Sequence, residues 1–160
     1  MLIFAVRLIV EEEGNMLFLR QTKKNGGRFS LIGGNVEENE FAREALAREA
    51  HEEAGIHVEP DELRLVHVLH RHKLKKDETL LVLYFRADRF HGEPASLEPK
   101  KFKDVRWLPV NNLPDEVSKA TLHVLRGIRR GEIYSEFPAR SKVLAFWEQF
   151  GERWAGLAGI

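Results

Sequence analysis

Residues 33–56 read GGNVEENEFAREALAREAHEEAGI, in which two glycines lead into a glutamate-rich run that closes on a third glycine. The run from Glu40 to Ala54 is typical of an α-helix, and Gly55 is a natural left-handed cap at its end. The preceding FSLI predicts a short buried strand that leads into the two glycines. This stretch therefore predicts a strand, a glycine turn and a helix.

Three glutamates of the predicted helix lie within a single turn. Glu49, Glu52 and Glu53 stand at i, i+3 and i+4, so their side chains project from one face. Three adjacent carboxylates raise one another's pKa values unless a cation neutralises them, and hard divalent ions prefer such oxygens. The alternative is a solvated surface helix in which Arg43 and Arg48 form weak ion pairs. We favour a metal site, because the acids outnumber the arginines and cluster where the helix dipole disfavours them.

Length and composition predict one domain over residues 1–160, since 43% of the residues are hydrophobic. The 25 basic residues balance 25 acidic ones, which provides no argument for nonspecific attraction to nucleic acid or to a membrane. The chain has no cysteine, which excludes disulfides and fits a cytoplasmic location. The apolar start MLIFAVRLIV is short and is followed by acidic residues, so it predicts a strand rather than a signal peptide.

The rest of the chain alternates between strand-like and helix-like patterns. Further strands are predicted at residues 2–10, 16–21, 62–73, 79–90 and 104–110. The first two should form a hairpin with Gly14-Asn15 as its turn. Amphipathic helices are predicted at residues 114–131 and at about 139–158. This order predicts an α+β fold, in which helices flank a mixed sheet as an α/β/α sandwich.

The last predicted helix carries an apolar stripe that must be covered. The stripe consists of Val143, Trp147, Phe150, Trp154 and Leu157. The domain itself would cover this stripe in a monomer, and a second copy of the chain would cover it in a homodimer.

The glutamate-rich stretch resembles the signature of the Nudix hydrolase family. Counting from Gly34, five residues lead to Glu40 and seven more to Arg48, which opens REAHEEAGI. The pattern G-x5-E-x7-R-E-U-x-E-E-x-G-U is matched except at its first bulky aliphatic position, which is Ala50 here. A weaker similarity to MutT-like nucleotide pyrophosphohydrolases continues through residues 90–114.

The resemblance implies a Mg²⁺-dependent hydrolase, with Mn²⁺ as a substitute, that cleaves the pyrophosphate bond of a nucleoside diphosphate derivative. By motif position, the metal ligands would be Glu49, Glu52, Glu53 and the backbone carbonyl of Gly33. The ion would neutralise the diphosphate and lower the pKa of the attacking water. Arg48 would orient the glutamates through charge-assisted hydrogen bonds.

The general base has two candidates, Glu52 in the helix and Glu98 in the SLEPKK loop. The alternative for Glu98 is a solvent-exposed glutamate beside two lysines.

Five further residues are candidates for substrate contacts. Four of them have the charge to bind phosphates, although each alone could be a solvated cation: Arg20, Arg71, Lys100 and Lys101. Phe29 could stack on a base or belong to the core. His67, His70 and His72 raise the question of zinc, and alternation places His70 and His72 on one strand face. Without a further ligand pattern, we favour surface or groove histidines.

The expected substrate is a small-molecule nucleotide, first of all a nucleoside triphosphate, oxidised ones included. ADP-ribose or another sugar nucleotide is the alternative, because specificity depends on loops that the sequence does not place in space. A hypothesis of another class is a nucleotide sensor without activity. We favour the enzyme, because the chain keeps every glutamate of the signature.

Overall fold

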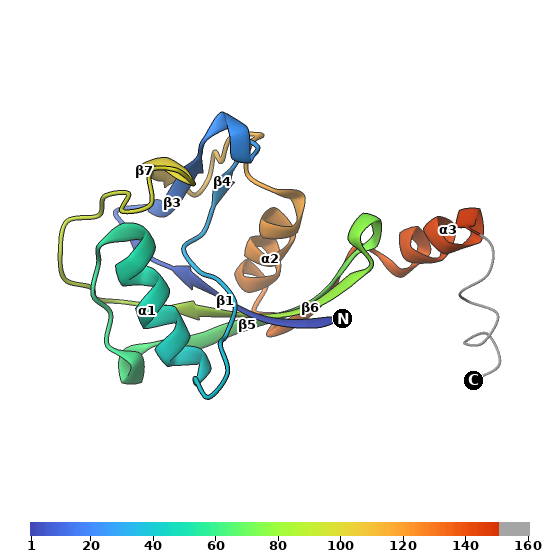
Figure 1. Cartoon of the computed structure of the whole chain (residues 1–160), viewed down its shortest axis with the longest axis horizontal. Helices are drawn as coiled ribbons and strands as arrows, with labels where there is room; N and C mark the ends of the chain where they lie inside the picture. The colour runs from blue at the N-terminus through green and yellow to red at the C-terminus, as the bar shows by residue number, and fades with distance from the viewer. Residues whose placement is uncertain (151–160) are drawn as a thin grey trace.

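A computed structural model describes residues 1–150, and its strands form two sheets (Figure 1). The first sheet has the order β1 (Leu2–Ile9), β6 (Glu78–Arg86), β5 (Arg64–Lys73) and β8 (Tyr134–Phe137). The second contains β2 (Glu11–Glu12), β3 (Asn15–Gln21), β4 (Phe29–Ser30) and β7 (Phe102–Pro109). The first sheet is mixed, because β1 pairs with β6 in parallel and β5 pairs with β6 antiparallel.

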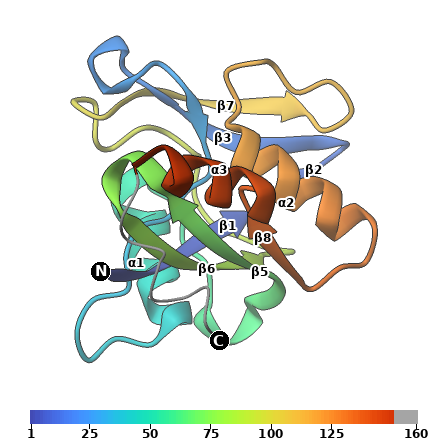
Figure 2. The ribbon, with the colours of Figure 1, turned by 90° about the vertical axis from the view of Figure 1, so that its right-hand side faces the viewer.

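Three α-helices accompany the sheets: α1 (Ala42–Ala54), α2 (Lys119–Arg129) and α3 (Arg140–Phe150). Figure 2 shows α1 and α2 on opposite sides of β1 and β6. Alternation along β1 explains this arrangement, because successive side chains point to opposite faces of a strand. Val6 and Leu8 join the core that contains the buried residues of α1, whereas Ala5 and Ile9 join the core that contains Val124 of α2. The predicted α+β fold with helices flanking a mixed sheet is confirmed.

The first hairpin turn lies one residue earlier than predicted. Glu12 pairs with Asn15, so the two loop residues are Glu13 and Gly14 rather than Gly14 and Asn15. Their φ angles are +49° and +77°. Two consecutive positive values match the twist of a tight hairpin, which explains why the turn settles on this pair.

Both predicted helix starts were too early. The first helix begins at Ala42 rather than Glu40, and the backbone amide of Phe41 donates to the Glu44 carboxylate at 2.9 Å. The second begins after Ser118 rather than at Pro114. The Ser118 hydroxyl accepts a hydrogen bond from the Thr121 amide at 3.1 Å, which satisfies one of the free donors of the first turn.

The strand bounds also differ from the predicted ranges. Only Phe29–Ser30 of the predicted FSLI strand forms β4, while the carbonyl of Ile32 bonds to the amide of Leu8 at 2.8 Å. Residues 60–62 form a single 3₁₀ turn, so β5 begins at residue 64. These shifts leave the order of the elements as predicted.

The strand β8 was not predicted. It pairs in parallel with β5, and the buried His67 links the two. The His67 Nδ1 lies 2.8 Å from the Glu132 carbonyl oxygen and Nε2 lies 2.7 Å from the Ser135 hydroxyl. A carbonyl oxygen can only accept, so Nδ1 is the protonated nitrogen that donates.

The helix α3 lies beside the turn between β5 and β6, away from the rest of the molecule (Figure 1). Val143 is buried at 7% exposure and Trp147 is half-buried, so part of the predicted apolar stripe is covered within the chain. Trp154, Leu157 and the end of the predicted helix lie outside the described residues, as does the side chain of Phe150. None of the helices within residues 1–150 is long and apolar enough to cross a membrane.

The hydrogen bonds of His67 generate a prediction about stability. We expect His67→Leu to lower the free energy of unfolding by about 1–3 kcal/mol, because it leaves the Glu132 carbonyl and the Ser135 hydroxyl without this partner. Urea denaturation measures the effect, and His91→Leu at an exposed position is the control. Equal stability of the two variants would contradict this role.

Candidate active site

The two glycines of the turn lie alongside β1 and meet different neighbours. The Val6 amide bonds to the Gly34 carbonyl at 2.9 Å, which holds the turn against the strand. A Cβ on Gly33 would lie 2.1 Å from the Val6 carbonyl oxygen, and the Gly33 φ is +149°. A Cβ on Gly34 would instead lie 2.1 Å from Oε1 of Glu49. At Gly33 the backbone of β1 leaves no room for a side chain, whereas at Gly34 the Glu49 carboxylate occupies that space.

Glu53 is the buried carboxyl of the site. Its side chain comes from α1, it is only 3% exposed, and its Oε2 accepts a hydrogen bond from the Gly33 amide at 2.9 Å. Burial raises the Glu53 pKa from its ordinary 4.5 to about 7, because the charged form loses water. The Gly33 hydrogen bond opposes this shift, and the charge of Glu49 adds to it.

Arg48 connects the other acidic residues. Its Nε donates to Glu40 at 2.8 Å, and its Nη1 lies 3.1 Å from both Glu49 Oε1 and Glu52 Oε2. Its Nη2 donates to the carbonyl of Asn35 at 3.3 Å. The hydrogen bond from Arg48 lowers the pKa of Glu40, and the same contact raises the pKa of Arg48. The guanidinium thus holds together the turn and the helix.

The donor set has the chemistry of a site for a hard divalent cation. Glu49, Glu52 and Glu53 offer carboxylate oxygens, and the burial of Glu53 gives a cation a reason to bind there. Within residues 1–150, however, no three acidic or histidine side chains are arranged closely enough to hold an ion. Arg48 engages two of these carboxylates and the Gly33 amide engages the third. A cation would therefore compete with Arg48 for Glu49 and Glu52.

The loop that carries Glu98 is joined to the end of α1. The Leu97 amide donates to the Glu53 carbonyl at 3.0 Å, and the Ala95 amide donates to the Ala54 carbonyl at 3.0 Å. The Glu98 carboxylate pairs with Lys101 Nζ at 3.1 Å. The positive charge of Lys101 lowers the pKa of Glu53, so this ion pair stands close to the buried carboxyl.

The predicted substrate contacts fall in three places. Lys100 is exposed, and its carbonyl accepts a hydrogen bond from the Asn25 side chain at 2.9 Å. The Arg20 guanidinium lies 4.4 Å from the centre of the Phe29 ring and 3.6 Å from the Glu116 carboxylate. Phe29 is only 5% exposed, so its ring belongs to the core that it shares with Phe18.

Arg71 lies on the α2 side of the first sheet, together with Arg7 and Tyr84. Its Nε is buried and has no hydrogen-bond partner within residues 1–150. Burial lowers the pKa of Arg71, and the charge of Arg7 lowers it further. An anionic ligand would relieve both effects, which makes Arg71 available for a phosphate.

One residue of this neighbourhood, Arg7, was missed in the sequence. Its Nη1 donates to the Val6 carbonyl at 2.7 Å and lies 3.5 Å from the Gly34 carbonyl, and its charge lowers the pKa of Glu53. A signal was available, because Arg7 is the only charge in the strand LIFAVRLI. Lys101, which the sequence offered as a possible phosphate contact, pairs with Glu98, and its charge also lowers the pKa of Glu53.

His67 lies apart from the other two histidines of β5. The rings of His70 and His72 lie 5.0 Å apart on one strand face, as alternation predicted. His67 is buried and bonded to Glu132 and Ser135 instead. Within the described chain no cluster of three ligating side chains includes these residues.

The raised pKa of Glu53 predicts how metal-free stability depends on pH. The folded state binds the Glu53 proton more tightly than the unfolded state does. The protonated carboxyl therefore stabilises the fold fully below about pH 4.5, and this stabilisation is lost as the pH rises through about 7. With a chelator present, the free energy of unfolding of Glu53→Gln should gain on that of the wild type as the pH rises. Between pH 4 and pH 8 the difference between the two proteins should change by about 3 kcal/mol in favour of the variant. Urea denaturation at both pH values checks this, with the exposed Glu38→Gln as control. Parallel pH dependence of Glu53→Gln and wild type would refute it.

The two glycines should respond differently to alanine. Gly33→Ala should lower the free energy of unfolding by about 1–3 kcal/mol, because its Cβ meets a backbone carbonyl at a positive φ. Gly34→Ala should keep most of the stability, because only the end of the flexible Glu49 side chain must move. Urea unfolding of both variants distinguishes these outcomes, and similar losses would contradict the assignment.

Comparison with known proteins places this architecture in a family. The NUDIX domain family matches residues 1–127. A MutT-like protein of Streptomyces ambofaciens is 35% identical over 120 residues, which are 73% of this chain and 67% of that protein. An oxidized purine nucleoside triphosphate hydrolase of Danio rerio is 27% identical over 107 residues, 67% of this chain and 65% of its own length. The chain thus spans about two thirds of these relatives.

A solved structure shares the fold. The crystal structure of a MutT NUDIX hydrolase from Burkholderia pseudomallei superposes with a TM-score of 0.72 at 25% identity. The match covers 79% of this chain and 97% of that one. Residues 1–127, which match the NUDIX domain family, contain the glutamates around Arg48, the glycine turn and the helix α1. The chain belongs to the NUDIX family, as the sequence of residues 33–56 predicted.

Proposed function

We propose that this protein is a Mg²⁺-dependent pyrophosphohydrolase that acts on nucleoside triphosphates, oxidised purine nucleotides included. The observation that carries the proposal is the arrangement of α1 against the glycine turn. Arg48 gathers Glu40, Glu49 and Glu52, while Glu53 is buried beside the Gly33 amide. Such an array of carboxylates costs free energy unless positive charge compensates it, and a divalent cation would supply that charge.

In this proposal Glu49, Glu52 and Glu53 would hold the divalent ion, which would supply positive charge against the diphosphate and lower the pKa of the attacking water. Without the ion, Arg48 holds the carboxylates of Glu49 and Glu52 in place through Nη1. The hydrogen bonds from Arg48 to Glu40 use Nε and Nη2, so they do not depend on those two contacts. Gly34 leaves room for the Glu49 carboxylate.

We propose Glu98 as the general base, with Glu52 as the alternative. The backbone of the Glu98 loop is bonded to Glu53, so the loop moves with the end of α1. The Glu98 carboxylate pairs with Lys101, whose charge also acts on Glu49 and Glu53. A carboxylate in this position can accept the proton of a water that attacks phosphorus. Glu52 is 48% exposed and is bonded to Arg48, which favours a ligand role for it.

Arg7 and Arg71 are the cations that support binding of the substrate phosphates. Arg7 stands between the two regions, because its charge acts on both Glu53 and Arg71. Neither arginine forms a carboxylate ion pair within residues 1–150, so an incoming phosphate would not have to displace one. Because positive charge extends from beside Glu53 through Arg7 to Arg71, the site favours a substrate with phosphates on both sides of the scissile bond.

The substrate class rests on the relatives named above and on the glutamates. The relative from Danio rerio is described as an oxidized purine nucleoside triphosphate hydrolase. ADP-ribose and other sugar nucleotides are the alternative substrates. A sensor without activity would not need Glu49, Glu52 and Glu53 together, so the hydrolase is the stronger proposal. The chain would act in the cytoplasm, where such nucleotides are found.

Phosphate and pyrophosphate release with Mg²⁺ tests the proposal. The substrates are nucleoside triphosphates, oxidised purine nucleotides, ADP-ribose and dinucleoside polyphosphates. We expect turnover of the triphosphates, and we expect Glu53→Gln to lower it at least about 100-fold by removing a charged ligand. Glu38→Gln changes the same charge at an exposed position and should keep wild-type turnover. Nucleotide binding without cleavage of any substrate would favour the sensor.

The base is tested by Glu98→Gln. Turnover should fall about 10²- to 10⁴-fold while the thermal midpoint stays near that of the wild type, because the side chain is partly exposed and makes only a surface ion pair. Glu93→Gln, at an exposed position in the same loop, is the matched control. Near-normal turnover of Glu98→Gln would remove Glu98 from the mechanism and leave Glu52.

A further inference from the structure

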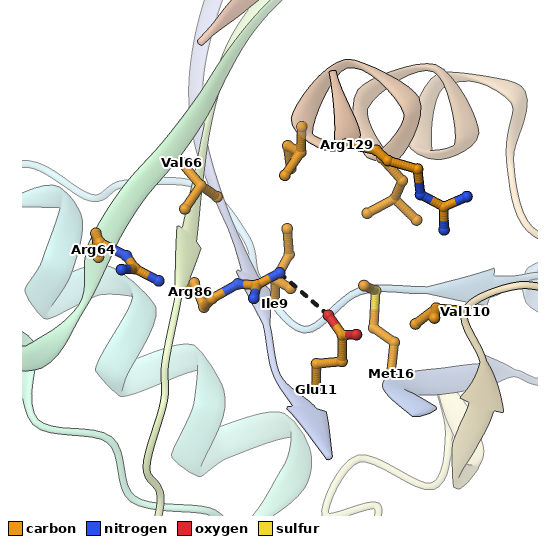
Figure 3. Close-up of a pocket in the computed structure, with 10 residues that line it drawn as sticks. Ile9, Glu11, Met16, Arg64, Val66, Arg86, Val110 and Arg129 are labelled. Atoms are coloured by element: carbon orange, nitrogen blue, oxygen red, sulfur yellow. Dashed lines mark hydrogen bonds and ion pairs between the residues drawn. The ribbon is translucent and has the colours of Figure 1, made fainter. Parts of the chain in front are cut away.

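A second cavity lies on the α2 side of the first sheet (Figure 3). It has a volume of about 520 Å³, which is in the range of small-molecule sites. Its walls come from the end of β1, the first hairpin, the outer ends of β5 and β6, and the last turns of α2. None of its lining residues belongs to the glycine turn, to α1 or to the Glu98 loop. The cavity is therefore separate from the glutamate site.

The floor of the cavity is apolar. Ile9 and Met16 are buried members of the core shared with α2, and Val66, Leu125 and Ile128 pack against them. In Figure 3, Ile9, Met16 and Val66 border the open space together with the charged side chains. Such a surface favours an apolar group of a ligand, which would be removed from water on binding.

Three guanidinium groups surround this floor, and one carboxylate accompanies them. Arg64 and Arg86 are direct cross-strand partners on β5 and β6. Like charges in that relation destabilise a sheet, so the pair is unfavourable unless an anion lies near it. Arg129 enters from α2 on the other side of the open space (Figure 3).

The partners of these arginines leave positive charge in excess. Arg86 pairs with Glu11 at 3.2 Å, and Arg64 lies 3.7 Å from the exposed Asp88. The only side-chain hydrogen bond of the Arg129 guanidinium within residues 1–150 goes to the neutral side chain of Asn111, at 3.3 Å. The lining residues therefore carry a net charge of +2, from three arginines and one glutamate. A dianion matches this charge.

We propose that this cavity binds a phosphate monoester with a flat apolar group, such as a nucleoside monophosphate. Guanidinium groups match the oxygens of a phosphate in pairs, and the planar group would lie on the Ile9 and Met16 floor. The carboxyl end of α2 carries the negative end of the helix dipole, so the phosphate lies towards Arg64 and Arg86. Arg129 adds positive charge from the opposite wall.

The two methionines of the chain allow a direct test. Met16 lines the cavity, whereas Met1 is 86% exposed at the other end of β1 and serves as an internal reference. The full chain is labelled at its methionine methyl groups, freed of metal with a chelator and titrated with AMP in the NMR tube. The Met16 signal should shift saturably and the Met1 signal should stay in place.

Partial ligands identify what the cavity recognises. Inorganic phosphate and adenosine should each bind at least about tenfold more weakly than AMP, because each lacks half of the ligand. Phenyl phosphate keeps both halves without a nucleobase. Equal affinity for AMP and phenyl phosphate would define a general site for aromatic phosphate monoesters, and stronger binding of AMP would define a nucleotide site.

Charge-neutralising variants locate the binding. Arg64→Gln and Arg129→Gln should each raise the dissociation constant for AMP about tenfold. Arg130→Gln is the matched control, because it follows Arg129 but does not line the cavity. One-dimensional spectra confirm that each variant is folded. The proposal is overturned if Met16 does not shift, or if its shift is unchanged in both cavity variants.

Discussion

The hydrogen bond from the Gly33 amide to the Glu53 carboxylate is the contact on which the candidate active site depends. It joins the glycine turn to α1 at a position where the carboxyl is 3% exposed. The backbone carbonyl of Glu53 also accepts a hydrogen bond from the Leu97 amide. Glu53 therefore ties together the turn, the helix and the Glu98 loop. A carboxyl buried this deeply is costly to ionise, so its charged form depends on the Gly33 hydrogen bond and on the positive charges of Lys101 and Arg7.

Arg48 complements this arrangement from the exposed side of the helix. It supplies the positive charge that keeps Glu40, Glu49 and Glu52 within one small region. Glu40 stands in the segment between the glycine turn and α1, so its contact with Arg48 ties that segment to the helix. The electrostatics and the local fold are thus maintained by the same side chain.

The first sheet separates two chemically different regions. On the α1 side lie carboxylates suited to a cation, and on the α2 side lie Arg71 and the cavity of Arg64, Arg86 and Arg129. Arg7 connects the two regions, because its guanidinium lies 3.5 Å from the Gly34 carbonyl of the glycine turn while its charge acts on Arg71. Strand alternation produces this division, since neighbouring residues of β1 point to opposite faces.

Local spacing alone determined much of this protein. The positions of Gly34, Glu49, Glu52 and Glu53 predicted the helix and the family, and helix geometry places Glu49 and Glu52 where Arg48 bonds to both. Tertiary structure decided features that depend on distant residues. Phe29 became core, β8 joined β5, and the Nε of Arg71 was left without a hydrogen-bond partner within residues 1–150. The arginine cavity unites segments from residues 9 to 129, and no spacing rule spans such separations.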